Sequence, residues 1–125
     1  MSNDEIIKKV AHDFNLVVRN YDEASLAIDR KVLQEASFVI GREVLLGKYK
    51  NESVRLASFF HEVGHVLEPK CNIDGITDLG VYKFTCEKDA WDKGIALAKK
   101  YDVVFSKEAL QFMVRCLYHA LKYRG

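Results

Sequence analysis

The sequence is poor in the features that mark several large protein classes. No apolar run in its 125 residues approaches the length needed to cross a bilayer. Its three cysteines, Cys71, Cys86 and Cys116, are odd in number and show no CxxC spacing, which favours reduced thiols over a disulfide framework. The N-terminal residues lack a basic segment followed by an apolar one, so we expect a cytoplasmic protein rather than an exported one.

Charge of one sign is not in excess either. Nineteen basic residues balance eighteen acidic ones, and the longest basic clusters are the pair 99–100 and the group 122–124. Nucleic-acid-binding domains usually carry a large basic patch, so no nucleic acid partner is indicated. Because 49% of the residues are hydrophobic and no stretch resembles a linker, residues 1–125 are expected to form a single domain with its own core.

Hydrophobic periodicity predicts a mainly helical α+β fold. A capping-box pattern over 2–5 opens an amphipathic helix that is expected to run to about Arg19. Short apolar or alternating runs follow, and they predict a small antiparallel sheet. These runs cover residues 25–28, 36–40 and 43–46.

The second half of the chain is predicted to be helical apart from one loop. Asn51 or Ser53 can cap a helix that continues to about residue 67, and residues 69–80 have the composition of a loop. Further helices are expected over about 87–101 and from near Ser106 onward. The expected buried face of the last helix consists of Leu110, Met113, Val114, Leu117 and Leu121.

The most informative motif is an HExxH sequence in the first of these later helices, over residues 61–65. Residues four apart lie on one face of a helix, so His61 and His65 can both point at one metal ion. Glu62 lies beside that face, where it can hold a water molecule and act as a general base. Polar groups in so apolar a helix are unfavourable unless something compensates them, and a metal does so. The motif therefore predicts a zinc site.

A tetrahedral catalytic zinc needs a third protein ligand and leaves its fourth position open. Cys71 is one candidate, because it stands six residues after His65, where the extended HExxHxxGxxH pattern has its third ligand. However, Glu68 stands where that pattern requires a glycine for its turn. Glu87, expected to open the next helix behind Thr85 as N-cap, is the other candidate. We favour Glu87 and keep Cys71 as the alternative.

Small residues support the choice of Glu87. Ala90, Gly94 and Ala98 recur every four residues and form a stripe along one face of the predicted helix. Glycine inside a helix costs about 1 kcal/mol relative to alanine, so a close helix crossing is a reason to keep it. We expect this stripe to approach the HExxH helix near Gly64, which would carry Glu87 towards the two histidines.

The stretch 60–65 followed by the segment 87–91 resembles the HExxH…ExxA arrangement of small gluzincin-type metallopeptidases, in particular the ImmA/IrrE group of phages and mobile elements. The resemblance covers roughly residues 53–98. It implies a minimal zincin-like domain whose small sheet packs on the HExxH helix, with Zn²⁺ bound by His61, His65 and Glu87 and with Glu62 as the general base. It also implies a protein substrate, with a transcriptional repressor as a candidate. Family members often have asparagine where this chain has Trp91.

Two points stay open at this level. A donor that stabilises the oxyanion cannot be chosen among Tyr82, Tyr118 and His119. Two further functions compete with peptide-bond hydrolysis. One is a non-catalytic, zinc-stabilised interaction module whose fourth position is closed by Cys71 or Cys86. The other is a metal-free helical adaptor of a phage or mobile element.

Overall fold

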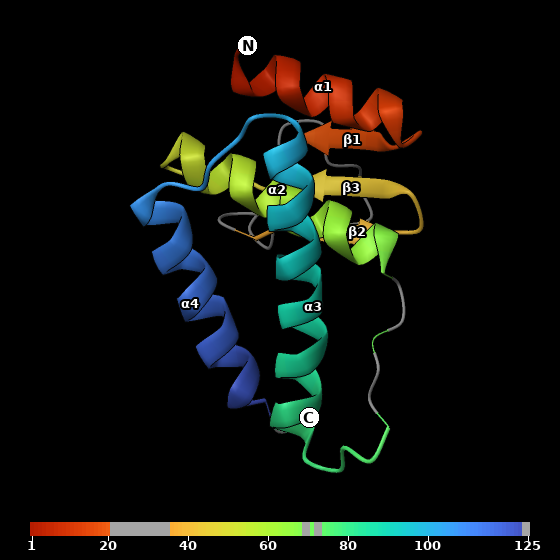
Figure 1. Cartoon of the computed structure of the whole chain (residues 1–125), viewed down its shortest axis with the longest axis vertical. Coiled ribbons are helices and arrows are strands. Elements are labelled where there is room, and N and C mark those ends of the chain that lie inside the picture. The colour runs from red at the N-terminus through yellow and green to blue at the C-terminus, as the bar shows by residue number, and fades with distance from the viewer. Residues whose placement is uncertain (21–35, 69–70, 72–73, 124–125) are drawn as a thin grey trace.

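A computed structural model describes residues 1–20, 36–68, 71 and 74–123, and it arranges them as four helices and three strands (Figure 1). The α+β, mainly helical fold predicted from the sequence is confirmed. The predicted run 25–28 lies outside the described residues. No helix in the described ranges is long and apolar enough to span a membrane.

Helix α1 (Asn3–Asp13) begins at the predicted capping box. The Ser2 hydroxyl accepts a hydrogen bond from the Glu5 amide, and the Glu5 carboxylate accepts one from the Ser2 amide, both at 3.2 Å. The expected extension to Arg19 is wrong, because the helix ends at Asp13 and Asn15 follows with a φ of 53°. Asparagine tolerates this left-handed conformation, which turns the chain into a strand.

The sheet has the strand order β1-β3-β2. Strands β2 (Phe38–Ile40) and β3 (Glu43–Leu46) form the predicted antiparallel hairpin, in which Gly41 adopts a φ of 60°. Strand β1 (Val17–Asn20) pairs with β3 in parallel, so the prediction of a wholly antiparallel sheet is wrong. Alternation along a strand shows which side chains face the core, but it does not show the strand's direction.

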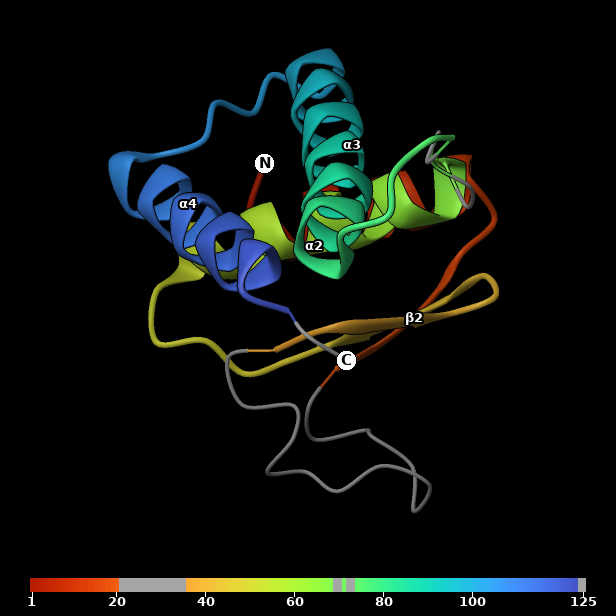
Figure 2. The ribbon, with the colours of Figure 1, turned by 90° about the horizontal axis from the view of Figure 1, so that it is seen from below.

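Helix α2 (Glu52–Leu67) lies across the sheet, with the other two later helices on its far side (Figure 2). Its Asn51 cap accepts hydrogen bonds from the Ser53 and Val54 amides. Phe59 and Val63 are completely buried in the same core cluster as Val44 and Leu46 of β3. The face of α2 that packs on the sheet is therefore opposite the face that carries the polar groups of the HExxH motif.

Helix α3 (Leu79–Lys100) begins well before the expected Glu87. Its N-cap is Asp78, whose carboxylate accepts a hydrogen bond from the Val81 amide. The predicted cap Thr85 instead donates its hydroxyl to the Val81 carbonyl, one turn earlier in the same helix. Glu87 thus lies about two turns inside α3, too far from its end to serve merely as a favourable acid for the helix dipole.

The small-residue contact between α2 and α3 is confirmed. A Cβ on Gly64 would lie 2.1 Å from the Ala90 carbonyl oxygen, and one on Gly94 would lie 2.6 Å from the Phe60 carbonyl oxygen. Each glycine therefore lets the backbone of one helix rest directly on the other. This crossing brings the third turn of α3 beside the HExxH turn of α2.

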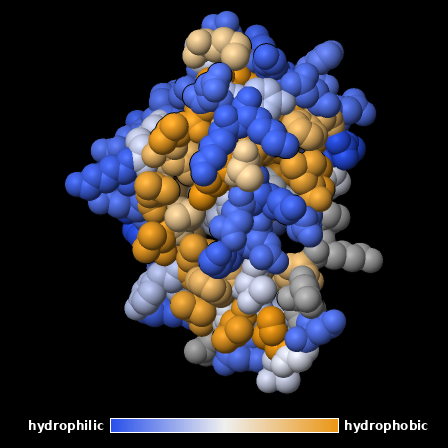
Figure 3. All heavy atoms as spheres, in the orientation of Figure 1, coloured by the Kyte–Doolittle hydropathy of each residue, from blue (hydrophilic) through white to orange (hydrophobic). Residues whose placement is uncertain are grey.

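Helix α4 (Lys107–Leu121) is capped by Ser106 as predicted, but its buried face is rotated from the expected one. Leu110, Val114 and Leu121 are exposed, while Met113 and Leu117 pack against the core. The packed face instead follows the small and aromatic residues of the helix, because these fit against α2 and α3. They are Ala109, Phe112, Cys116 and Ala120. The exposed apolar residues contribute to the hydrophobic surface on the α4 side in Figure 3.

Candidate metal centre

The structure brings the three predicted ligands together. His61 and His65 project from one face of α2, and Glu87 reaches them from α3. Their ligand atoms all lie within 4.8 Å of one another, an arrangement that can hold a metal ion. One carboxylate oxygen, Oε2 of Glu87, lies 2.8 Å from Nε2 of His61 and 3.2 Å from Nε2 of His65. The three side chains therefore converge on one point.

The electrostatics of the group favour an ionised carboxylate next to imidazole. Burial raises the pKa of Glu87, but the close approach of the His61 and His65 rings to its carboxylate outweighs burial and holds that pKa well below its ordinary range. Burial lowers the pKa of His61 despite the opposing effect of Glu87. Burial also acts to lower the pKa of His65, but the hydrogen bond to Glu87 and the nearby carboxylate charges together have the larger effect, so the pKa of His65 is raised.

These residues could hold a metal ion. Nε2 of His61 is buried and, although it lies close to Glu87, has no hydrogen-bond partner of proper geometry. A buried ring nitrogen without such a partner is unusual in a folded protein, and a cation shared with Glu87 accounts for it. Two imidazoles and one carboxylate are also a common donor set of catalytic zinc, which leaves one coordination position open.

Glu62 occupies the position expected of a base beside this group. Its side chain is 10% exposed, and its Oε1 lies 3.6 Å from Nδ1 of His61. Burial raises the pKa of Glu62 to about 8. The positive charge of a bound cation favours the ionised carboxylate, which is the form that accepts a proton.

A cavity of about 800 Å³ opens onto these residues. Its lining includes Glu62 and the three converging side chains, and it comes largely from β2, α2, α3 and α4. The more apolar part of the wall includes Val39, Tyr49 and Phe112. Its volume lies within the range of small-molecule sites.

The cysteines differ from their prediction. Cys71 and Cys86 form a disulfide, whereas Cys116 is free. The expectation that all three are reduced thiols therefore differs from the structure, because the Cα atoms of Cys71 and Cys86 lie 5.3 Å apart, within reach of a disulfide. A sulfur held in a disulfide has no thiolate to offer, and Cys71 is not part of the converging group. Cys71, the alternative third ligand, therefore does not join the ligand group that the described residues form.

Two side chains at the centre were not anticipated. Nζ of Lys83 lies 3.2 Å from Oε1 of Glu87, the carboxylate oxygen that faces away from the histidines. The i, i+4 spacing of this pair was visible in the sequence, but the helix was expected to begin only at Glu87. Trp91 stacks on His61, with ring centroids 4.2 Å apart and planes 3° apart. No sequence signal indicated this contact.

Only one of the three candidate oxyanion donors lines the cavity. His119 lines the cavity, while Tyr82 and Tyr118 are exposed and are not among its lining residues. Tyr49 lines the cavity as well, and its hydroxyl is 2.9 Å from the Ser37 hydroxyl. Burial raises the pKa of Tyr49, so the phenol keeps its proton and remains a hydrogen-bond donor.

The chain was compared with known protein families, curated proteins and solved structures, and none of the three comparisons finds a match.

Proposed function

We propose that this protein is a zinc-dependent peptidase with Glu62 as its general base. The observation that carries the proposal is the placement of a buried carboxylate beside a converging His–His–Glu group, in the lining of an open cavity. Structural zinc sites are closed by four protein ligands. In the described part of the chain this group has three members, which supports a site that admits water and substrate.

In this proposal each side chain has one role. His61, His65 and Glu87 hold the ion, and Lys83 holds the outer oxygen of Glu87 so that the inner oxygen faces the histidines. When bound, zinc supplies Lewis acidity, which polarises a carbonyl group and lowers the pKa of a water molecule. Glu62 takes the proton of the attacking water and passes it to the amine that leaves when the C–N bond breaks.

The proposed substrate is a protein or peptide. The sequence resemblance to ImmA/IrrE-type peptidases suggests a transcriptional repressor as a candidate. The mixed polar and apolar walls of the cavity are compatible with a peptide chain, which presents both kinds of group. The competing interaction module needs a fourth ligand, and the cysteines considered for that role, Cys71 and Cys86, are joined to each other.

Metal content and activity test the proposal together. Untagged protein purified without added metal should contain about one zinc per chain by elemental analysis, and the His61→Ala/His65→Ala variant should contain almost none. Glu62→Gln should retain the zinc and the fold but lose two or more orders of magnitude of hydrolysis, which is the usual scale for a general base. Repressor-like proteins and unfolded casein serve as substrates.

The outcomes separate the three functions. Equal, negligible zinc in wild type and double variant would remove the metal site and leave the metal-free adaptor. Zinc retained by both wild type and Glu62→Gln, with no hydrolysis of any substrate by either, would favour the interaction module. Equal hydrolysis by wild type and Glu62→Gln would assign the activity to other residues or to a contaminant.

A further inference from the structure

Trp91 stacks on His61 of the candidate metal centre with the two rings nearly parallel. Its indole is completely buried and lies nearly parallel to the imidazole of His61, with 3° between the planes, whereas His65 is tilted by 55° to that same imidazole. Two further rings contact the indole edge-on, Phe105 and Phe112, each with its centroid 6.3 Å away. The plane of the indole is therefore determined by its neighbours.

The position of Trp91 on α3 links this contact to the ligand set. Trp91 lies four residues after Glu87, so one face of the helix presents both the carboxylate and the indole to α2. Between them is Ala90, whose carbonyl contacts the backbone at Gly64. The close crossing of the two helices thus sets the height of the indole over the imidazole of His61.

The orientation of His61 has no other strong support among these contacts. In most metal sites the second ring nitrogen of a ligating histidine donates a hydrogen bond to an oxygen, which fixes the plane of the ring. Here the Glu62 carboxylate lies 3.6 Å from Nδ1 of His61, beyond hydrogen-bond distance. The indole face covers the ring instead.

Packing alone does not explain a tryptophan at this position. The indole N–H of Trp91 is buried and has no hydrogen-bond partner among the described residues. A buried donor of this kind is unfavourable, and a phenyl ring would fill part of the space without it. The larger indole covers more of the imidazole face, which a role in orienting His61 requires.

We propose that Trp91 is a positioning residue of the metal centre: by stacking on His61 it holds the imidazole with Nε2 directed at the shared ligand position beside Glu87. The inference rests on the proposed metal site. It assigns to an aromatic face the task that a hydrogen bond performs in most metal sites.

Zinc affinity tests this role. Competition with a chromogenic chelator would be measured for wild type, Trp91→Phe and Trp91→Leu, with Phe59→Leu as the matched control because Phe59 is an equally buried ring in the other core cluster. We expect Trp91→Leu to bind zinc about 10–100-fold more weakly than wild type, the range typical for residues that support a ligand. Trp91→Phe, which keeps a smaller aromatic face, should fall between wild type and Trp91→Leu, and Phe59→Leu should stay within about threefold of wild type.

The results separate this inference from the metal site on which it rests. Wild-type affinity in Trp91→Leu would overturn the role of Trp91 while leaving the site intact. A wild-type protein that binds no zinc would overturn both. Equal weakening in Phe59→Leu and Trp91→Leu would show that lost core packing, and not the stack, is responsible, and would overturn the role of Trp91.

A second measurement needs no variant of Trp91. Trp91 is the single tryptophan of the chain, so tryptophan emission reports on the surroundings of this one residue. Titration of wild type with Co²⁺ should quench the emission in step with the visible absorption of the bound ion and saturate at one equivalent, and His61→Ala should abolish both signals. Emission that does not change while Co²⁺ absorption saturates would overturn the stacked arrangement.

Discussion

The backbone of Gly64 on α2 rests on the carbonyl oxygen of Ala90 on α3, so closely that an added Cβ would lie 2.1 Å from that oxygen. The neighbouring turns carry the side chains of the candidate metal centre, His61 and His65 on one helix and Glu87 on the other. The distance between the two helices therefore decides whether one ion can be shared by all three.

Gly64→Ala tests this crossing. Overpacking typically costs about 1–3 kcal/mol, while the better helix propensity of alanine recovers at most about 1 kcal/mol. Because the clash is with backbone, which cannot rotate away, we expect a net loss of about 1–2 kcal/mol in the free energy of unfolding. Urea denaturation would measure it. Gly94→Ala should behave alike, since its Cβ would meet the Phe60 carbonyl. Unchanged stability in both variants would contradict the close contact.

Glu87→Ala should weaken zinc binding more than the change of any supporting residue. Loss of a residue behind a ligand typically costs about 10–100-fold in affinity, and loss of a ligand itself should exceed that range. Cys71→Ser/Cys86→Ser should remain within about threefold of wild type, because neither sulfur belongs to the converging group. Chelator competition gives both values. The opposite order would return the third ligand to Cys71.

The Cys71–Cys86 disulfide predicts a measurable dependence on reductant. Alkylation of the denatured but unreduced protein should modify one thiol, that of Cys116, and alkylation after reduction should modify three. A bridge across 15 residues stabilises a protein by about 3 kcal/mol in the chain-entropy treatment, so reduction should lower the denaturation midpoint. The bridge-free double serine variant should show no response.

The same alkylation bears on the predicted cytoplasmic location. Protein trapped with an alkylating agent at the moment of cell lysis reports the thiol state in the cell. Three modified cysteines would agree with the reduced thiols expected in a cytoplasm. One modified cysteine would speak for an oxidising compartment and against that prediction.

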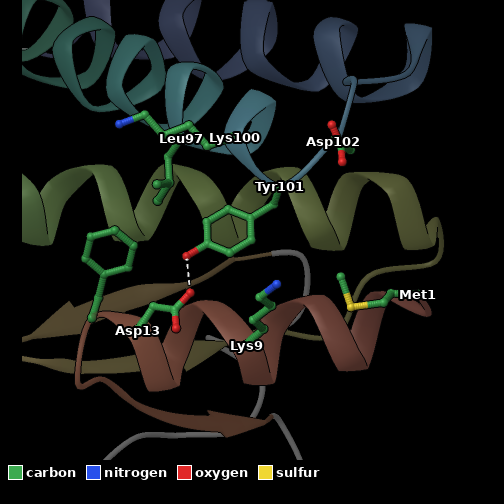
Figure 4. A pocket seen from close by; sticks show the side chains of 8 residues that line it. Met1, Lys9, Asp13, Leu97, Lys100, Tyr101 and Asp102 are labelled. Atoms are coloured by element: carbon green, nitrogen blue, oxygen red, sulfur yellow. Dashed lines mark hydrogen bonds between the residues drawn. The ribbon is translucent and has the colours of Figure 1, made fainter.

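Tyr101 and Asp13 predict a pH-dependent contribution to stability. Figure 4 shows the Tyr101 hydroxyl, at the end of α3, donating to the Asp13 carboxylate at the end of α1, over a distance of 2.6 Å. This hydrogen bond is the main cause that lowers the pKa of Asp13. Partial desolvation and, next, the same bond raise the pKa of Tyr101 to about 12.

The sign of the effect differs at the two ends of the pH scale. A lowered carboxyl pKa gives stability that is present at neutral pH and is lost as the pH falls below about 4. A raised phenol pKa gives stability that is present below about pH 10 and is lost as the pH rises towards 12. Tyr101→Phe should therefore be less stable than wild type near pH 7, and the difference should shrink at both extremes. A difference that does not vary with pH would contradict this assignment.

Local spacing in the sequence is enough to predict the part of the candidate site that lies on one helix. His61 and His65 share a face because four residues make about one turn, whatever the rest of the chain does. Caps are local as well, which is why the sequence offers Asn51, beside Ser53, and Ser106 as helix starts. The stripe of small residues predicted a close crossing, because only glycine and alanine let two helix backbones approach so closely.

Local sequence patterns therefore suffice to predict the helical character, the HExxH face and the capacity for a close crossing. The tertiary structure alone decided the parallel direction of β1, the rotated face of α4, the Cys71–Cys86 bridge and the stacking of Trp91 on His61. Each of these depends on which surfaces meet across long separations in the chain. Periodicity describes one element at a time, whereas such contacts depend on how the elements pack against one another.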